Sequence, residues 1–303
     1  MADLVGFYIN LDRANERREF LQEQFTRLNL GSRYRRFTAI DGHNVAAFSS
    51  RLTPQESGCF MSHLNLLAEI AQSDTAFAHI LEDDTVLSSS FDHVIDILMN
   101  NRIPDVFDIL FLDIGLPINS PSAMAVLLDT YLKATTRESL PNPKFQELQI
   151  IDLKDIPFAG AASYIVSPSG AAKLCLLLEE AKATGEALPV DLVFRDLALA
   201  GRIKAGCTLP FLTTIRLAQD APSQIRDDLG GGSGDVTEEE KRGRAARNLL
   251  PYFLLRQIFY IECNWDKVFS DLDRHFPLVG PTNFHVAFMR IIRSFYERDF
   301  NFI

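Results

Sequence analysis

The chain has 303 residues, of which 47% are hydrophobic and 23% are charged. These values are ordinary for globular proteins and exclude a mainly disordered, collagen-like or coiled-coil chain. The length predicts one large domain or two smaller ones, and either can bury a core without disulfides or a structural metal. A net charge of −10 argues against nucleic acid as a partner of the whole molecule.

The charge is unevenly distributed along the chain. From Lys241 onward, 10 Lys and Arg residues stand against 6 Asp and Glu residues, a net charge of +4, which leaves −14 for residues 1–240. The basic tail could face a membrane or an acidic partner. Alternatively, it could be a helical tail packed on the acidic body.

We expect a cytoplasmic protein with buried, reduced thiols. The four cysteines are far apart in the sequence, with no CxxC pair, so their spacing predicts neither a zinc site nor the disulfide framework of a small secreted domain. The first apolar stretch, residues 4–9, is too short for a signal peptide and runs into charged residues. Nor does the chain contain an uninterrupted apolar stretch of about 18 residues, as a transmembrane helix would require.

The first part of the chain predicts an α/β sheet, because buried strands alternate with helices. We expect strands over residues 4–9, 34–40, 76–81 and 108–112. Helices are expected between them, over residues 15–28, 54–72 and 91–100. The second helix has the clearest start. Thr53 can cap it, Pro54 suits its first position and Glu56 completes a capping box.

Residues 116–157 are irregular, with five prolines around a weak helix near 123–133. Long segments of this kind are often lids or binding loops. Beyond them we expect a strand, a helix capped by Ser167, another helix and a last short strand, over residues 161–166, 168–184, 189–200 and 208–215. The Gly-rich acidic segment 227–237 is the clearest linker, and the pattern of 238–303 is typical of helices.

Three adjacent carboxylates, Glu82, Asp83 and Asp84, follow the strand at 76–81. Ligands bind at the carboxyl ends of strands in α/β sheets. Like charges this close raise one another's pKa, and a hard dication such as Mg²⁺ or Mn²⁺ removes that penalty while keeping positions open for diphosphate oxygens. The alternative is a solvated acidic turn.

Other candidate ligand-binding residues lie near the first strand ends. Arg13 and Arg17 could bind a diphosphate, or they could pair with acidic neighbours on an exposed helix face. Asp41 and Gly42 could hold ribose hydroxyls or form a plain turn. His63 could be a ligand or a hydrogen-bonded packing residue. The chain has no GxGxxG after the first strand, and it has no phosphate loop, GxSxG elbow or HExxH motif.

Taken in series, these pieces resemble glycosyltransferase family 25, whose bacterial members act in lipooligosaccharide and lipopolysaccharide biosynthesis and whose animal members are collagen galactosyltransferases. The matching motifs occur in the family's order and cover about residues 4–226. They are Tyr8-Ile9-Asn10-Leu11-Asp12-Arg13 with Arg17-Arg18, Phe37-Thr38-Ala39-Ile40-Asp41-Gly42, Leu52 to Cys59 with Ser62-His63-Leu64, Ile80 to Asp84, Gly160 to Gly170, Pro189-Val190-Asp191, and Gln219 with Ser223-Gln224-Ile225.

The resemblance implies a GT-A-like, Rossmann-type nucleotide-sugar-binding domain over 1–226, followed by the linker 227–237 and a helical extension over 238–303. It also implies a metal-dependent inverting transfer in which the acidic triplet plays the DxD role. Asp84 and the weaker ligand Glu82 would hold Mn²⁺ or Mg²⁺, and Asp83 would face the ribose or donor sugar. The other implied donor-binding residues are Asn10, Arg13, Arg17, Asp41, Gly42, His63 and Gln219. Here Ser223-Gln224-Ile225 replaces a frequent Ser-Asp-Ile, so a carboxylate role at that position is in doubt.

An inverting transfer is a direct displacement at the anomeric carbon. It needs a base for the acceptor hydroxyl and a cation for the departing nucleoside diphosphate. Asp191 is our first candidate base, because it lies at a predicted helix start inside a family motif, although it could instead cap that helix. Asp113 is the second candidate and Asp220 the third. We expect a UDP-hexose donor, carrying galactose or glucose, and a glycan or lipid-linked acceptor.

Two other functions fit the same residues. The carboxylates could serve another nucleotide-dependent transferase or a phosphate-ester hydrolase, or the chain could be a non-catalytic binding protein that kept the fold. A peripheral membrane contact would come through the extension. There Arg242, Arg244 and Arg247 lie near two aromatic pairs, Tyr252-Phe253 and Phe259-Tyr260. Core packing or a dimer contact would explain that mixture equally well.

Overall fold

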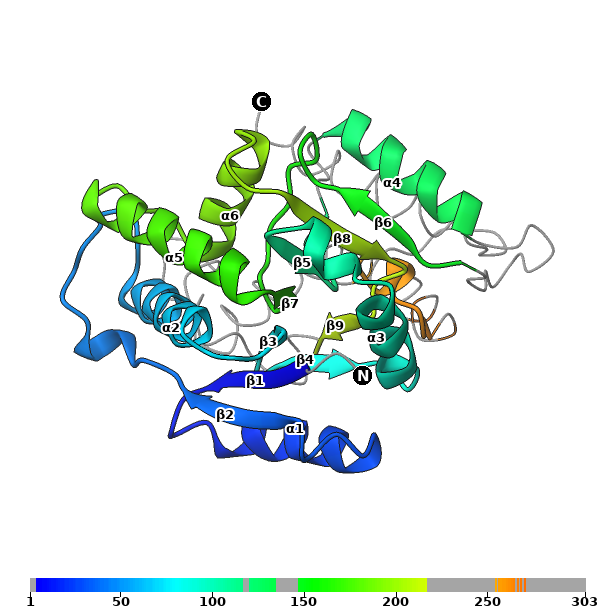
Figure 1. Ribbon diagram of the computed structural model, residues 1–303, viewed down its shortest axis with the longest axis horizontal. Coiled ribbons are helices and arrows are strands. Elements are labelled where there is room, and N and C mark those ends of the chain that lie inside the picture. Colours follow the sequence, from blue (N-terminus) through cyan, green and yellow to red (C-terminus); the bar gives the residue numbers. More distant parts are fainter. Residues whose placement is uncertain are drawn as a thin grey trace, which may run out of the picture.

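A seven-stranded sheet forms the centre of the molecule (Figure 1). This computed structural model describes residues 4–116, 120–134, 147–216, 254, 256–264, 266, 268 and 270. The strands run in the order β2-β1-β3-β7-β5-β8-β6. Their bounds are β1 Leu4–Asn10, β2 Tyr34–Thr38, β3 Phe77–Glu82, β5 Ile109–Phe111, β6 Gln149–Asp152, β7 Ser163–Val166 and β8 Ala205–Leu209. Five strands point the same way, because only β7 and β6 pair antiparallel with their neighbours.

Helices cover both faces of this sheet, which makes a three-layer α/β fold (Figure 1). One face packs against α2 (Pro54–Ala71), α4 (Pro121–Ala134), α5 (Pro168–Ala183) and α6 (Val190–Leu199). The other packs against α1 (Asn15–Arg27) and α3 (Phe91–Asn100). Two short 3-10 turns, η1 (Gly42–Asn44) and η2 (Ile103–Val106), connect these elements, and β4 (Thr85–Leu87) and β9 (Thr213–Ile215) form a separate two-stranded ladder. The expected α/β architecture is confirmed.

The two-sided burial explains why the strands are continuously apolar. Successive side chains of a strand point to opposite faces. Accordingly, Phe7 and Ile9 pack in the core beneath α2, whereas Tyr8 packs in the core beneath α1. In the same way Ile80 faces the first core and Leu81 the second. A strand buried on both faces has no polar alternation, as in parallel sheets generally.

The described residues near the end of the chain pack into the main core. Leu254, Ile258 and Phe259 belong to the core beneath α2. The amide of Phe211 donates to the carbonyl of Phe259 at 2.8 Å, and the amide of Ile261 donates to the carbonyl of Phe211 at 3.0 Å. Core packing therefore explains Phe259 and its neighbour Tyr260, which are both buried. The linker 227–237, Arg242, Arg244, Arg247 and Tyr252-Phe253 lie outside the described residues.

The capping prediction at the start of α2 is confirmed. Thr53 accepts a hydrogen bond from the Glu56 amide at 3.1 Å, and the Glu56 carboxylate accepts one from the Thr53 amide at 2.9 Å. Pro54 occupies the first position, where its missing N–H leaves no orphan donor. This cap fixes the start of the helix that carries Cys59 and His63, two residues of the site described below.

The single last strand expected over 208–215 is wrong. That segment contains the end of β8 and, separately, β9, and the two strands belong to different sheets. Between them, Pro210 has no amide hydrogen, and Phe211 pairs with the C-terminal segment instead of a strand of the sheet. The sequence pattern also missed β4 and β6, which are short and lack a clean alternation of apolar and polar residues.

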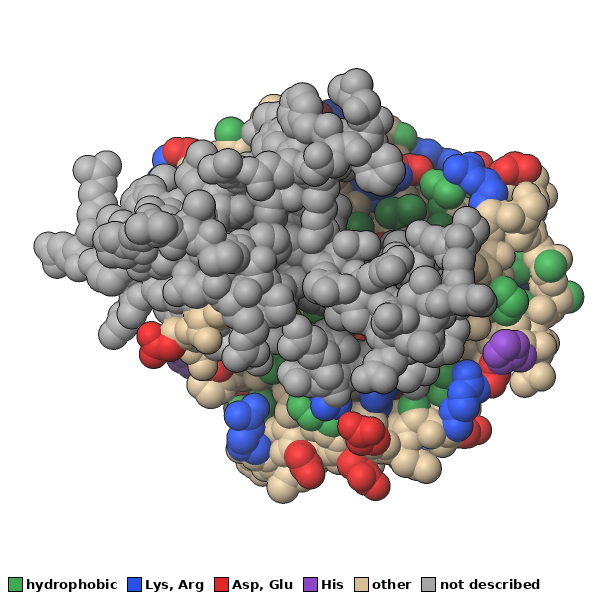
Figure 2. Space-filling view, turned by 180° about the vertical axis from the view of Figure 1, so that it is seen from behind, with side chains coloured by type: hydrophobic (Ala, Val, Ile, Leu, Met, Phe, Trp, Pro, Cys, Tyr) green, Lys and Arg blue, Asp and Glu red, His purple; other side chains and the backbone are tan. Residues whose placement is uncertain are grey.

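The described surface is mixed in charge. On the face shown in Figure 2, Lys and Arg side chains lie among Asp and Glu side chains around the described margin. Within the described part of the chain, no helix combines the length and apolarity needed to cross a membrane.

Candidate functional site

The carboxyl ends of β1, β2 and β3 meet at one edge of the sheet. In the register of these strands, Asn10 lies beside Thr38 and Ile9 beside Glu82. The segments that leave the three strands therefore converge. They line a pocket of about 100 Å³. Its lining includes the predicted residues Arg13, Arg17, Asp41, Gly42, His63, Glu82, Asp83 and Asp84.

Asp83 is held in place rather than solvated. Its side chain accepts one hydrogen bond from Asn10 Nδ2 at 2.8 Å and another from an Arg17 guanidinium nitrogen at 2.7 Å. Asn10 is buried and also donates to the carbonyl of Ala14, at 3.0 Å. Burial raises the pKa of Asp83, although Arg17 opposes the shift. Because both oxygens of Asp83 are engaged, its contribution in this arrangement is to position Asn10 and Arg17.

Arg17 also lies beside Asp84, with a guanidinium nitrogen 3.6 Å from Asp84 Oδ2. Its side chain is only 12% exposed, so it is not part of a solvated helix face. Burial alone would lower the pKa of Arg17, but the surrounding carboxylates raise it. The guanidinium group therefore stays charged at the floor of the pocket.

The pKa values of Glu82 and Asp84 shift in opposite directions. Burial acts to raise the pKa of Glu82, but His63, Arg17 and Arg256 outweigh it and lower this pKa. For Asp84, burial and the charge of Glu82 raise the pKa to about 7. Such a pattern is expected for two neighbouring acids that do not both ionise readily without a cation between them.

The surroundings of Asp84 fit a hard metal ion. Its Oδ1 is buried, and no residue in the described part of the chain donates a hydrogen bond to it. Leaving such an atom unpartnered is costly unless a ligand satisfies it. Carboxylate oxygens are the donors that Mg²⁺ and Mn²⁺ prefer, and Asp84 and Glu82 supply them. The acidic triplet is thus not a solvated turn.

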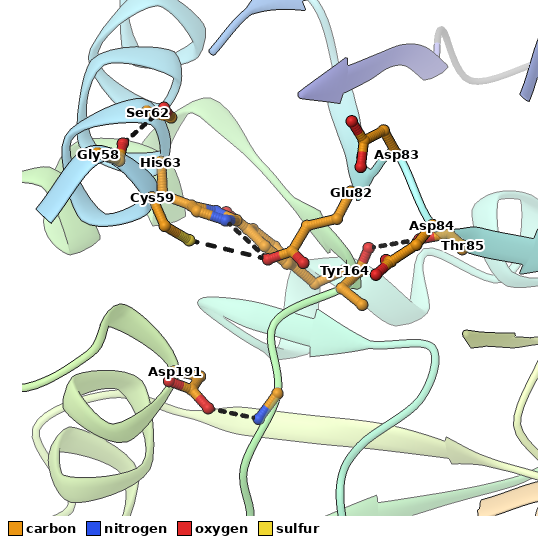
Figure 3. A network of polar contacts seen from close by, with 12 residues as sticks. Gly58, Cys59, Ser62, His63, Glu82, Asp83, Asp84, Thr85, Tyr164 and Asp191 are labelled. Carbon is orange, nitrogen blue, oxygen red and sulfur yellow. Dashed lines mark hydrogen bonds and ion pairs between the residues drawn. The ribbon is translucent and has the colours of Figure 1, made fainter. Parts of the chain in front are cut away.

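His63 is fully buried on α2 and points at Glu82 (Figure 3). Its Nδ1 is 2.8 Å from the hydroxyl of Tyr164, and its Nε2 is 3.4 Å from Glu82 Oε1. The ring is therefore fixed between β7 and the end of β3. His63 is therefore a hydrogen-bonded packing residue, one of the two roles left open by the sequence, and it also lines the pocket.

Arg13 and Asp41 form the rim of the pocket. The Arg13 side chain is 53% exposed and forms an ion pair with Asp41. A hydrogen bond from the backbone amide of His43, together with Arg13, holds the pKa of Asp41 below its usual value. Asp41 also caps η1, so the expected turn is present.

A second cavity, of about 310 Å³, shares Cys59, Glu82 and Asp84 with the pocket. Asp191 lies in its lining, at the second position of α6. Pro189, not Asp191, occupies the cap position of this helix. Asp191 Oδ2 accepts a hydrogen bond from the Gly160 amide at 2.8 Å (Figure 3). Among the described residues, none donates to Oδ1.

Asp113 does not reach this cavity. It is fully buried at the end of β5, where it forms an ion pair with Arg256. Burial raises the pKa of Asp113, and Arg256 opposes the shift. Arg256 itself lines the second cavity. Sequence reasoning missed Arg256, because it lies far along the chain in a segment without a recognisable motif. Gln219 and Asp220 lie outside the described residues.

The close approach of η1 to α2 depends on Gly42 and Gly58, which have no Cβ atoms to clash with the facing backbone. A Cβ on Gly58 would lie 2.6 Å from the Gly42 amide nitrogen and 2.6 Å from the Ile40 carbonyl oxygen. We therefore expect Gly58→Ala to lower the free energy of unfolding by about 2 kcal/mol, as overpacking against rigid backbone does. A thermal melt should show a fall in Tm of about 4–8 °C. Gly31→Ala, with nothing within 4 Å of its Cβ, is the control and should melt like the parent. Equal melting of both variants would contradict this packing.

The sequence of the chain is similar to known proteins. Residues 4–194 match the family model described as glycosyltransferase family 25 (LPS biosynthesis protein). Over 96 residues, which are 29% of this chain and 36% of the relative, the sequence is 28% identical to lipooligosaccharide biosynthesis protein lic2B of Haemophilus influenzae. The chain thus matches about a third of the length of that curated relative. The matched range of the family model includes the pocket and extends to Asp191.

Proposed function

The chain belongs to glycosyltransferase family 25, and from this premise we propose that it is a metal-dependent inverting glycosyltransferase. It moves a hexose, galactose or glucose, from a UDP-sugar to a glycan or lipooligosaccharide acceptor. One observation carries the proposal. The pocket at the strand ends and the cavity beside Asp191 share Glu82 and Asp84, so two substrates can meet at the acidic triplet.

The pocket suits the donor. Arg17 supplies a buried positive charge next to Asp84, and Arg13 supplies another at the rim. Guanidinium groups bind diphosphates through paired hydrogen bonds. Asp41 follows the end of the second strand, and its carboxylate would accept hydrogen bonds from ribose hydroxyls.

The acidic pair suits a cation. Asp84 and Glu82 are the residues that would hold Mn²⁺ or Mg²⁺. Such an ion, when bound, neutralises the charge that builds on a departing nucleoside diphosphate. Arg17 adds to the same effect from the protein side, because its charge faces both Asp83 and Asp84.

Asp191 suits the role of general base. Its carboxylate takes the proton of the acceptor hydroxyl while the acceptor oxygen forms a bond to the anomeric carbon. The bond from that carbon to the diphosphate oxygen breaks, and the nucleoside diphosphate leaves with the electron pair. The Gly160 amide holds Oδ2 of Asp191, which keeps the carboxylate oriented toward the cavity without adding a charge.

A donor screen tests this function directly. Full-length protein is incubated with Mn²⁺ and individual UDP-sugars, and released UDP is measured with and without glycan acceptors. We expect UDP release from one hexose donor, abolished by EDTA. Thermal shift with the same sugars and with plain nucleotides separates the alternatives, because a ligand that binds the native state raises Tm. Stabilisation by nucleotides alone would favour another nucleotide-dependent enzyme, and no stabilisation at all would favour a non-catalytic protein.

Arg17 should contribute to donor affinity. In Arg17→Ala, Asp83 loses its charge-assisted hydrogen bond and the diphosphate loses a buried cation. Such a bond is worth about 1.5–3 kcal/mol, so we expect UDP to bind about 10- to 100-fold more weakly in the presence of Mn²⁺. Isothermal titration calorimetry measures this change. Arg18→Ala is the matched control, since Arg18 pairs with Asn15 outside the pocket. An unchanged UDP affinity in Arg17→Ala would exclude this role.

A further inference from the structure

Cys59, His63 and Glu82 bring three different metal-binding groups together (Figure 3). Cys59 and His63 lie one turn apart on α2 and both face the end of β3. Cys59 Sγ is 4.0 Å from Glu82 Oε1, and His63 Nε2 is 3.4 Å from the same oxygen. The three donor atoms all lie within 4.8 Å of one another.

This spacing is close to that of a zinc site. Zn²⁺ bound to sulfur at about 2.3 Å and to nitrogen or oxygen at about 2.1 Å keeps tetrahedral ligands about 3.4–3.6 Å apart. The donor atoms, which all lie within 4.8 Å of one another, would reach this spacing by small rotations of the Cys59 and Glu82 side chains. Three protein ligands with an open fourth position are also a common zinc arrangement.

The histidine is already oriented as a metal ligand would be. Its Nδ1 is hydrogen-bonded to the hydroxyl of Tyr164 at 2.8 Å, and the two rings stack with centroids 5.8 Å apart. A partner on the second ring nitrogen is typical of histidines that bind metals, because it fixes both the ring and the tautomer. Nε2 is thereby directed at Glu82.

The chemistry of this cluster differs from that of Asp84. A thiolate and an imidazole select soft or borderline ions such as Zn²⁺, whereas an all-oxygen set selects Mg²⁺ or Mn²⁺. Glu82 is a candidate ligand in both sets, with Cys59 and His63 in one and with Asp84 in the other. It lines both the pocket and the second cavity. An ion held by Cys59 and His63 would draw this carboxylate away from Asp84.

We propose that Cys59, His63 and Glu82 form a site for a thiophilic dication, with Zn²⁺ as its probe, and that filling this site inhibits the transferase. The binding part stands on the geometry alone, and the inhibitory part rests on the proposed function. The distances between cysteines along the sequence did not indicate this site. Its ligands are a Cys-x₃-His pair on one helix and a glutamate from a neighbouring strand.

Cobalt absorption tests the binding part on the full-length protein without donor or acceptor. Co²⁺ is titrated in, and the near-ultraviolet band of a thiolate–cobalt bond is followed. We expect one equivalent to produce the band and Zn²⁺ to remove it. Cys59→Ser should abolish the band and weaken Zn²⁺ binding at least about tenfold. Cys175→Ser, at a half-buried cysteine on α5 outside the cluster, should keep both. Circular dichroism verifies that each variant is folded.

Two results would overturn the binding part. One is a parent protein with no cobalt–thiolate band, and the other is a band that survives in folded Cys59→Ser. His63→Gln provides a second check, since it should weaken Zn²⁺ binding in the same way. These measurements need no catalytic activity, so they remain decisive even if no UDP-sugar is turned over.

Zinc inhibition tests the regulatory part. In the donor assay with Mn²⁺, we expect micromolar Zn²⁺ to suppress UDP release by the parent. Each variant is compared with its own activity without Zn²⁺, and Cys59→Ser should need at least about tenfold more Zn²⁺ for the same fractional loss. Cys175→Ser should respond like the parent. Equal sensitivity of Cys59→Ser and the parent would overturn the regulatory part while leaving the function proposed above intact.

Discussion

Replacing Asp84 with asparagine is expected to lower the rate of sugar transfer by about 100- to 1000-fold, the usual effect of removing one strong electrostatic stabiliser of a transition state. Asparagine keeps the size of the side chain but removes the charge that would hold the metal. The variant also loses the ion pair with Arg17, 3.6 Å from Asp84 Oδ2, whereas the buried Oδ1 accepts no hydrogen bond from any described residue. Steady-state UDP release at saturating Mn²⁺ measures the change.

The control for this variant is Asp155→Asn, which removes an exposed carboxylate outside both cavities. It should transfer sugar at the rate of the parent. Transfer by Asp84→Asn at the parental rate, together with insensitivity of the parent to EDTA, would rule out a metal held by the acidic triplet.

The same variant should also change stability in a pH-dependent way. Burial raises the pKa of Asp84 from 3.8 to about 7 in the folded protein. The folded state thus holds this proton more tightly than the unfolded state, and the stabilisation it brings is present below about pH 4 and lost as the pH rises through 7. At pH 8 the rise in pKa corresponds to at most about 4 kcal/mol, and the lost ion pair with Arg17 offsets part of it, so in EDTA we expect Asp84→Asn to be more stable than the parent by about 2 kcal/mol. Urea melts at pH 8 and pH 4 should show the difference only at the higher pH.

Asp191→Asn should separate donor binding from transfer. A general base contributes about 10²- to 10⁴-fold to rate, so we expect transfer to the acceptor to fall by that range. UDP affinity in the presence of Mn²⁺ should stay at the parental value, because Asp191 lines only the second cavity. The asparagine carbonyl can still accept the hydrogen bond from the Gly160 amide, so the loop position is kept.

Asp196→Asn is the matched control on the same helix, since Asp196 is exposed and pairs with Arg195. It should leave both transfer and UDP affinity unchanged. If Asp191→Asn transferred sugar at the parental rate, Asp191 could not be the base. If it lost UDP affinity as well, Asp191 would belong to the donor pocket instead.

Much of the fold could be predicted because local signals and the global arrangement agree. The capping box at Thr53 and Glu56 predicts the start of α2. The apolar runs of β1 and β3 predict strands that are buried on both faces. The position of the pocket could be predicted from the order of strands and helices. Ligands to a parallel sheet lie at its carboxyl edge, so residues following β1, β2 and β3 had to meet.

The rest depends on contacts between distant segments, which no local pattern contains. Arg256 pairs with Asp113 across 143 positions of sequence, and Asp113 does not line the second cavity. The cluster of Cys59, His63 and Glu82 likewise needs the packing of α2 against β3. The prediction merges β8 and β9, because the run from Thr208 to Ile215 is rich in β-branched and aromatic residues and only the pairing partners distinguish the two strands.

The central claim is that Asp84 and Glu82 bind a dication that also binds a nucleoside diphosphate. Crystals grown with MnCl₂ and UDP, with data collected near the manganese absorption edge, test it most directly. We predict an anomalous peak about 2.0–2.4 Å from a carboxylate oxygen of Asp84 and from a diphosphate oxygen of UDP. UDP bound in the pocket with no manganese peak at Asp84, or a peak at a separate site with the pocket empty, would contradict the account.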